Sequence, residues 1–182
     1  MSKYRRSHMG RVFFFTVVTE NRDPILTTDL GRQALREAIL KVRQDFPFQI
    51  VAFVLLPDHL HTVWELPTND LNYSARWQRI KTAFTKTWRK SGGRMPTRSV
   101  SRQVKGEHAI WQRRFYEHTC RDEADLKRCV DYIHINPVKH GLVNCVQDWE
   151  WSSFHRYVEA GEYSIDWGNA DDWFGDEFQQ FE

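Results

Sequence analysis

Pro57-Asp58-His59-Leu60-His61-Thr62-Val63-Trp64 is the stretch around which the rest of the chain is organised. It follows an apolar run, Ile50 to Leu56, that contains no charge. Proline fixes φ and aspartate favours turns, so Pro57-Asp58 predicts a tight turn between two hairpin strands. Side chains alternate faces along a strand, which places His59 and His61 on one face. Such a pair can hold a divalent metal if a third ligand joins it; two polar side chains on a solvated face are the alternative.

The length and composition predict one globular domain. The chain has 182 residues, of which 41% are hydrophobic and 14% aromatic, and this excludes a disordered protein. No apolar run is long enough to cross a bilayer, and no secretory apolar core follows the first residues, so we expect a cytoplasmic protein. The three cysteines, Cys120, Cys129 and Cys145, have no C-x-x-C spacing. This argues against a disulfide framework and a zinc ribbon.

The net charge of +2 conceals an uneven distribution. Residues 161–182 contain seven acidic residues and no lysine or arginine, which leaves 26 basic against 17 acidic residues in the rest of the chain. A basic body with an acidic end indicates a polyanionic partner and a tail, 166–182, that could compete with that partner. Ordinary solvated surface is the alternative.

Hydrophobic periodicity predicts alternating strands and helices. Strands are expected at 12–18, 48–56 and 59–66, and a strand or short hairpin over 109–119. Helices are expected at about 30–45, 71–90 and 123–136, with caps at Thr28 or Asp29 and at Asp122. The composition of 91–106, rich in Gly, Ser, Arg and Pro, predicts a mobile basic loop.

Basic residues dominate the middle of the chain. Between Asp70 and Glu107 there is no acidic residue but there are ten basic ones. A run of one sign favours phosphate contact over a solvated face, which usually mixes signs. Near the N-terminus an aromatic residue stands beside two guanidiniums, which can stack on a base and pair with phosphate, although a frayed terminus is the commoner explanation. The predicted nucleic-acid-binding residues are Tyr4, Arg5, Arg6, Arg76, Arg79, Lys81, Lys86 and Arg89.

A second constellation lies on the helix predicted at 123–136. Tyr132 and Asn136 are one turn apart on one face, and Pro137 disfavours further helix, so both are expected near the helix end. An amide oxygen from Asn136 with two imidazoles suits Mg²⁺ or Mn²⁺ rather than catalytic zinc, which usually has a third strong ligand. Taken alone, Tyr132 is more simply a surface or half-buried aromatic residue.

Two motifs in this order resemble a known family. Leu56 to Trp64, followed by Asp131-Tyr-Ile-His-Ile-Asn-Pro-Val-Lys-His-Gly141, closely resembles the REP-associated tyrosine transposases. These belong to the superfamily of single-tyrosine transposases with a His-hydrophobe-His motif. The resemblance covers about residues 3 to 170 and includes Tyr4-Arg-Arg, Trp111-Gln-x-Arg-Phe115, Trp149 and Ser153-Phe-His155.

The resemblance implies a fold. It is an α+β fold with a ferredoxin-like βαββαβ antiparallel sheet, helices on one face, and a C-terminal catalytic helix and tail. The expected division is one HUH transposase-like catalytic domain over 1–165 and an acidic, aromatic tail over 166–182.

The resemblance also implies an activity. The expected enzyme nicks and rejoins single-stranded DNA at REP-like palindromic hairpins with a divalent metal, Mg²⁺ or Mn²⁺. Tyr132 is the expected nucleophile, forming a covalent 5′-phosphotyrosine, and His59, His61 and Asn136 are the expected metal ligands. The partners are single-stranded DNA hairpins and no membrane, and the protein is a monomer or homodimer. Two alternatives remain: a non-catalytic hairpin-binding regulator and a metal-dependent RNA-processing nuclease.

Overall fold

The computed structural model describes residues 10–169, so Tyr4, Arg5, Arg6 and the tail beyond residue 169 lie outside the described residues. The strands are β1 (Val12–Val18), β2 (Gln49–Leu55), β3 (His59–Glu65) and β4 (Tyr116–Thr119). The helices are α1 (Asp29–Asp45), α2 (Tyr73–Lys90), α3 (Val100–Val104), α4 (Glu123–Lys139) and α5 (Phe154–Glu159), with short 3-10 turns η1 (Glu20–Arg22) and η2 (Val146–Asp148).

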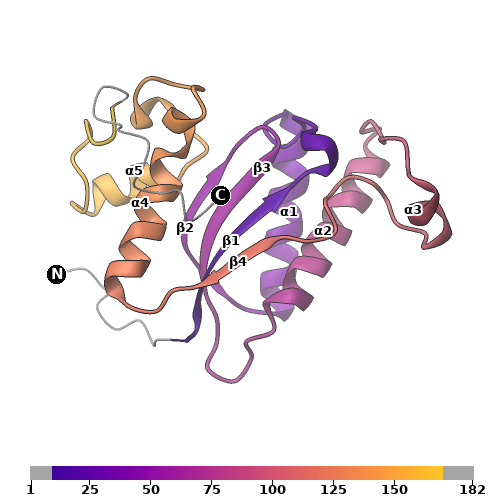
Figure 1. Ribbon diagram of the computed structural model, residues 1–182, viewed down its shortest axis with the longest axis horizontal. Coiled ribbons are helices and arrows are strands. Elements are labelled where there is room, and N and C mark those ends of the chain that lie inside the picture. Colours follow the sequence, from indigo (N-terminus) through magenta and orange to yellow (C-terminus); the bar gives the residue numbers. More distant parts are fainter. Residues whose placement is uncertain (1–9, 170–182) are drawn as a thin grey trace.

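The four strands form one antiparallel sheet in the order β2-β3-β1-β4. Together with α1 between β1 and β2 and α2 between β3 and β4, this is the expected ferredoxin-like arrangement. Helices α1 and α2 pack together on one side of the sheet, and α4 lies on the other (Figure 1). The predicted fold class is therefore confirmed.

Side-chain alternation along β3 divides the core into two halves. Leu60 and Trp64 point to the α1–α2 side, where the Trp64 ring stacks on Trp77 with centroids 4.3 Å apart. Val63 points to the α4 side and packs with Ile133. Because both faces of β3 are covered, every residue from His59 to Trp64 is buried. The histidine pair therefore does not lie on a solvated face.

The helices begin where short polar side chains were expected. Thr28 accepts a hydrogen bond from the backbone N–H of Gly31, and Asp122 accepts one from Asp125. Each side chain satisfies an N–H group that the first turn of a helix leaves without a partner. The predicted caps of α1 and α4 are confirmed.

Helix α4 continues three residues beyond the predicted end. Pro137 lies inside it, and the helix ends at Lys139. The backbone N–H of His140 donates to the carbonyl of Asn136, 3.0 Å away, so the last turn closes around the proline. The proline only biases the preceding residue away from helix, and packing of the buried Ile135 and Val138 outweighs that bias.

The segment 91–106 is not the plain loop that its composition predicted. It contains α3, and its arginines form ion pairs with the turn after β1. Arg94 Nη2 lies 2.5 Å from Asp23 Oδ1, and Arg102 pairs with Glu20. The residues between Asp70 and Glu107 include no acidic ones, but acidic residues elsewhere in the chain neutralise part of their positive charge.

Arg76, one of the predicted DNA-binding residues, is a core residue. It is fully buried, and its guanidinium donates to the carbonyls of Pro47 and Asn72 and to Asp70 Oδ2, at 3.0–3.1 Å. A phosphate from outside cannot reach these nitrogens, so the prediction for Arg76 is wrong. The hydrophobic periodicity of a helix predicts which residues pack in the core. It does not predict that one arginine is buried as well and hydrogen-bonds to the preceding loop.

None of the helices in residues 10–169 combines the length and the apolar character needed to span a membrane.

Substitution of Arg76 tests this structural role. We expect Arg76→Ala to lower the free energy of unfolding by about 2–4 kcal/mol, because it leaves a cavity and buried carbonyls without donors. The measurement is urea denaturation followed by circular dichroism. The matched control is Lys86→Ala, an exposed residue of the same helix, which should change stability by less than about 0.5 kcal/mol. Equal effects of the two variants would contradict the assignment.

Candidate active site

The two halves of the predicted site meet between β3 and α4. The His59 and His61 rings lie 4.9 Å apart at a near-perpendicular angle, and the Tyr132 ring lies 5.1 Å from that of His61. Asn136, one turn after Tyr132, is fully buried and lies beside both imidazoles. The structure therefore brings together all four residues that the sequence singled out.

Hydrogen bonds from the protein fix the orientation of both imidazoles. His59 Nδ1 lies 2.6 Å from Asp58 Oδ1, and His61 Nδ1 lies 2.9 Å from Thr16 Oγ1. Thr16 stands directly opposite His61 in the pairing of β1 with β3. With Nδ1 engaged on each ring, Nε2 is the nitrogen left to bind a metal, which is a common arrangement around metal-ligating histidines.

Burial also favours the neutral form of both rings. It lowers the pKa of His59, against the opposing effect of Asp58, and it holds the pKa of His61 well below the ordinary value. The neighbouring His59 lowers the pKa of His61 further. A metal ligand must be an unprotonated imidazole nitrogen, so this environment prepares both histidines for coordination near neutral pH.

Buried polar atoms without partners indicate that these residues fit a cation. Three buried polar atoms of the site make no hydrogen bond within the described residues: His61 Nε2, Asn136 Oδ1 and Asn136 Nδ2. Such atoms are rare in native proteins because each costs desolvation energy. Two imidazole nitrogens and an amide oxygen form a mixed donor set that suits Mg²⁺ or Mn²⁺.

Lys139 and His140 are functional candidates that the sequence interpretation missed. Lys139 Nζ lies 5.0 Å from the centroid of the Tyr132 ring, and the His140 ring lies 5.0 Å from that of His59. Both follow Pro137, where the helix was expected to have ended. The signal that could have identified them is their spacing: Tyr132 to Lys139 is seven residues, or two turns, on one face.

The sequence analysis also did not identify Asp58 and Thr16 as the residues that orient the two imidazoles. Asp58 was assigned only to the turn, although its carboxylate bonds the neighbouring imidazole and accepts a hydrogen bond from Arg22 at 3.0 Å. Thr16 is the only polar side chain in the strand Val12–Val18. A lone hydroxyl in a buried strand needs a partner, and that need was the available signal.

A second group of potential ligands lies at the start of α4. His118, Asp125 and Cys129 each present a ligand atom within 4.8 Å of the others. The Asp125 carboxylate, however, already accepts hydrogen bonds from His118, Arg121 and Arg128. Burial opposes ionisation of this group, but Arg121 and His118 outweigh it and lower its pKa to about 2. Its oxygens thus have partners already, so this group anchors the first turn of α4.

The remaining basic candidates lie on α2, on the side of the sheet opposite the histidines. The Arg79 guanidinium stacks on the Phe46 ring at 4.2 Å. Lys81 donates to the carbonyl of Gln112 at 2.9 Å, and Arg89 lies 2.8 Å from His108 Nε2. Lys86 is exposed. These four residues are therefore not part of the histidine site.

The Thr16 hydroxyl can be tested as a support for His61. We expect Thr16→Val to weaken Mn²⁺ binding by about tenfold or more, because the ring loses the group that holds its orientation. The measurement is isothermal titration calorimetry with Mn²⁺ and no DNA. Thr16→Ser keeps the hydroxyl and should bind Mn²⁺ like the unmodified protein. If the valine variant binds equally well, Thr16 does not position His61.

Comparisons with known proteins agree with this geometry. Residues 12–136 match the family model described as Transposase IS200 like. A REP-associated tyrosine transposase of Escherichia coli (strain K12) is 46% identical over 169 residues, which cover 92% of this chain and 91% of that protein. A solved structure described as a REP-associated tyrosine transposase bound to a REP hairpin has a TM-score of 0.71 and 44% identity, and the match covers 96% of each chain. The chain therefore belongs to the IS200-like transposases and, within them, to the REP-associated tyrosine transposases.

Proposed function

We propose that this protein is a metal-dependent transposase that nicks and rejoins single-stranded DNA at palindromic hairpins. The observation that carries the proposal is the meeting of His59, His61 and Asn136 beside Tyr132, with buried ligand atoms that have no partner. The relative bound to a REP hairpin supports a hairpin of this kind as the substrate.

The chemistry assigned to Tyr132 is nucleophilic attack on a phosphodiester. The phenolate oxygen forms a bond to phosphorus, the bond from phosphorus to the 3′ oxygen breaks, and the leaving group takes a proton to become a free 3′-OH. The strand downstream of the break stays attached through its 5′ phosphate as a phosphotyrosine, which keeps the energy of the broken bond. A second 3′-OH can attack this link, release Tyr132 and rejoin DNA without another energy source.

Three candidate metal ligands and one basic side chain support this chemistry. His59, His61 and Asn136 would hold Mg²⁺ or Mn²⁺, which acts when bound as a Lewis acid on the non-bridging phosphate oxygens. The Lys139 ammonium next to the Tyr132 ring places a positive charge beside the attacking residue. His134 is not suited to be the base, because its Nε2 lies 2.8 Å from Ser153 Oγ and its ring packs on Tyr157.

Several sequence-based expectations remain part of the proposal. Base recognition by Tyr4, Arg5 and Arg6 and restraint of cleavage by the tail concern residues outside 10–169. The division into 1–165 and 166–182, a cytoplasmic location, and a monomeric or homodimeric state also remain predictions. Arg79, Lys81, Lys86 and Arg89 remain predicted DNA contacts.

Replacement of Tyr132 tests the covalent mechanism. We expect Tyr132→Phe to abolish the covalent adduct with a labelled single-stranded hairpin in the presence of Mn²⁺, because phenylalanine lacks the attacking oxygen. A denaturing gel detects the adduct as labelled protein. Hairpin affinity, measured by fluorescence anisotropy, should change less than about threefold, since the ring remains in place.

The same variant separates the alternative functions. A metal-dependent nuclease that uses water would still cut DNA or RNA after Tyr132→Phe. A regulator that acts by occupancy would form no adduct even with the tyrosine present. Labelled adduct from the unmodified protein, lost in the variant, excludes both alternatives.

A further inference from the structure

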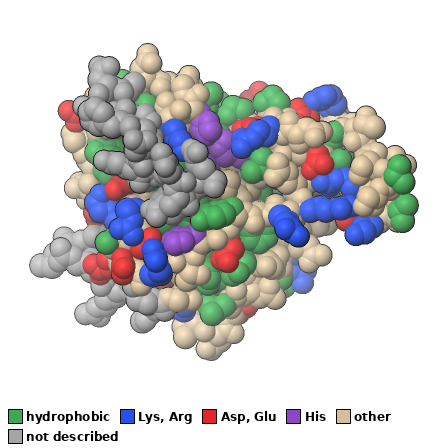
Figure 2. Space-filling model, viewed as in Figure 1, with side chains coloured by type: hydrophobic (Ala, Val, Ile, Leu, Met, Phe, Trp, Pro, Cys, Tyr) green, Lys and Arg blue, Asp and Glu red, His purple; other side chains and the backbone are tan. Residues whose placement is uncertain are grey.

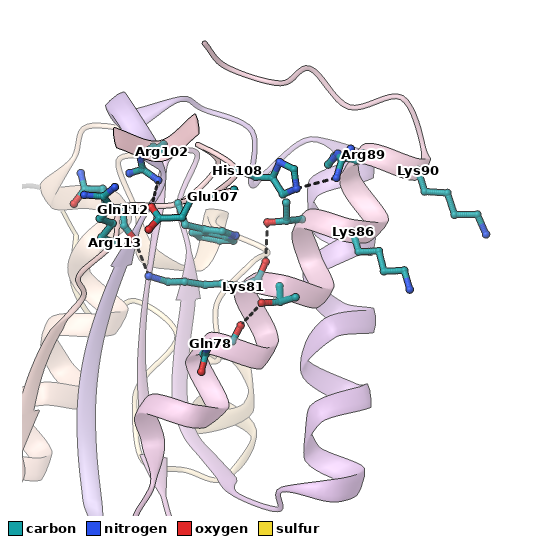
Figure 3. A pocket seen from close by; sticks show the side chains of 14 residues that line it. Gln78, Lys81, Lys86, Arg89, Lys90, Arg102, Glu107, His108, Gln112 and Arg113 are labelled. Carbon is teal, nitrogen blue, oxygen red and sulfur yellow. Dashed lines mark hydrogen bonds and ion pairs between the residues drawn. The ribbon is translucent and has the colours of Figure 1, made fainter. Parts of the chain in front are cut away.

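A basic groove lies beside the C-terminal half of α2, apart from the histidine site. It has a volume of about 920 Å³ and is formed by α2 and the segment 106–113. Its side chains include Lys81, Arg89, Arg102 and Arg113, while Lys86 and Lys90 extend away from the cavity (Figure 3). Glu107 is the acidic residue of the lining. The groove therefore carries an excess of positive charge.

The cations of this groove differ in how far the protein already neutralises them. Arg102 pairs with Glu20, and Arg113 Nε lies 2.8 Å from Glu107 Oε2. Lys81 has no carboxylate partner among residues 10–169; it donates to the carbonyl of Gln112 and lies 5.5 Å from the Phe115 ring centroid. Burial lowers the pKa of Lys81 to about 8. An anion entering the groove would supply the missing countercharge.

Backbone hydrogen bonds connect Lys81 to the histidine site. Thr19 N donates to the carbonyl of Asp58 at 2.8 Å, and Gln112 N donates to the carbonyl of Val18 at 3.0 Å. Lys81 in turn donates to the carbonyl of Gln112. Neighbouring strands are about 4.8 Å apart, so Gln112 lies roughly 10 Å from Asp58. A few nucleotides of an extended single strand would span that distance.

The groove is lined by groups that suit phosphate. In the view of Figure 2, lysine and arginine side chains gather on the side that carries α3. The buried Trp111 offers no free face for a base, whereas amines, guanidiniums and amides face the cavity. These groups suit the phosphate backbone rather than the bases.

We propose that this groove binds the phosphodiester backbone of the single-stranded arm that flanks the hairpin, with Lys81 as its central contact. The inference rests on the proposed function and adds a site for a part of the substrate outside the hairpin. The contact is independent of base sequence, because charge and hydrogen bonding to phosphate carry no sequence information.

The test compares hairpins with and without an arm. Fluorescence anisotropy gives Kd for a bare hairpin, for one with a ten-nucleotide 5′ arm and for one with a ten-nucleotide 3′ arm, between 50 and 200 mM NaCl. We expect Lys81→Gln to weaken binding of one armed hairpin by about three- to tenfold and to lower its salt slope by about 0.7. Binding of the bare hairpin should not change. Lys81→Arg, which keeps the cation, should restore arm binding.

The control is Lys41→Gln, which removes the same charge from an exposed position on α1. It should leave all three affinities unchanged, and circular dichroism verifies the fold of each variant. The inference is overturned if Lys81→Gln weakens the bare hairpin equally, if it weakens none of them, or if the unmodified protein binds armed and bare hairpins alike. Failure of the proposed function would be seen differently, as the absence of a covalent adduct from the unmodified protein. The failure of this inference and the failure of the proposed function can therefore be told apart.

Discussion

The pairing of β1 with β3 is the constraint on which the candidate site depends. In this register Thr16 faces His61 and Val18 faces His59, so both imidazoles point toward α4 and one of them meets its hydroxyl partner. A slip of one residue would turn both histidines into the α1–α2 half of the core and bring Leu60 toward Asn136. The burial of β3 on both faces excludes that slip, because Trp64 would lose its stacking on Trp77.

Local sequence patterns predicted most of the fold because they depend on local physics. The alternation of β3, the caps Thr28 and Asp122, and the single helical turn from Tyr132 to Asn136 each follow from backbone geometry alone. The family resemblance then joined two motifs that spacing could not join, since nothing local shows that β3 faces α4. The end of α4 was wrong for a related reason: Pro137 is a local signal, and tertiary packing outweighed it.

The roles of the basic residues were the hardest feature to predict from the sequence. A run of one sign suggested phosphate contact, yet Arg76 satisfies buried carbonyls and Arg94 and Arg102 pair with acidic residues some 70 to 80 positions earlier in the chain. Whether a cation is neutralised depends on which distant segment folds against it. The fold therefore separates internal counterions, such as Arg102, from Lys81, which has no carboxylate partner among residues 10–169.

The turn after β1 has an unusual backbone that bears on how this protein can change. Asn21 and Arg22 have φ values of 54° and 52°. Glycine and asparagine tolerate this left-handed region, whereas other residues occupy it at a cost of about 1–2 kcal/mol. The Arg22–Asp58 pair is largely exposed on the arginine side and contributes less than about 1 kcal/mol. Laboratory selection for heat resistance alone would thus favour asparagine or glycine at position 22. Such variants would lose the guanidinium behind Asp58, so a gain in thermal tolerance would come with a looser His59.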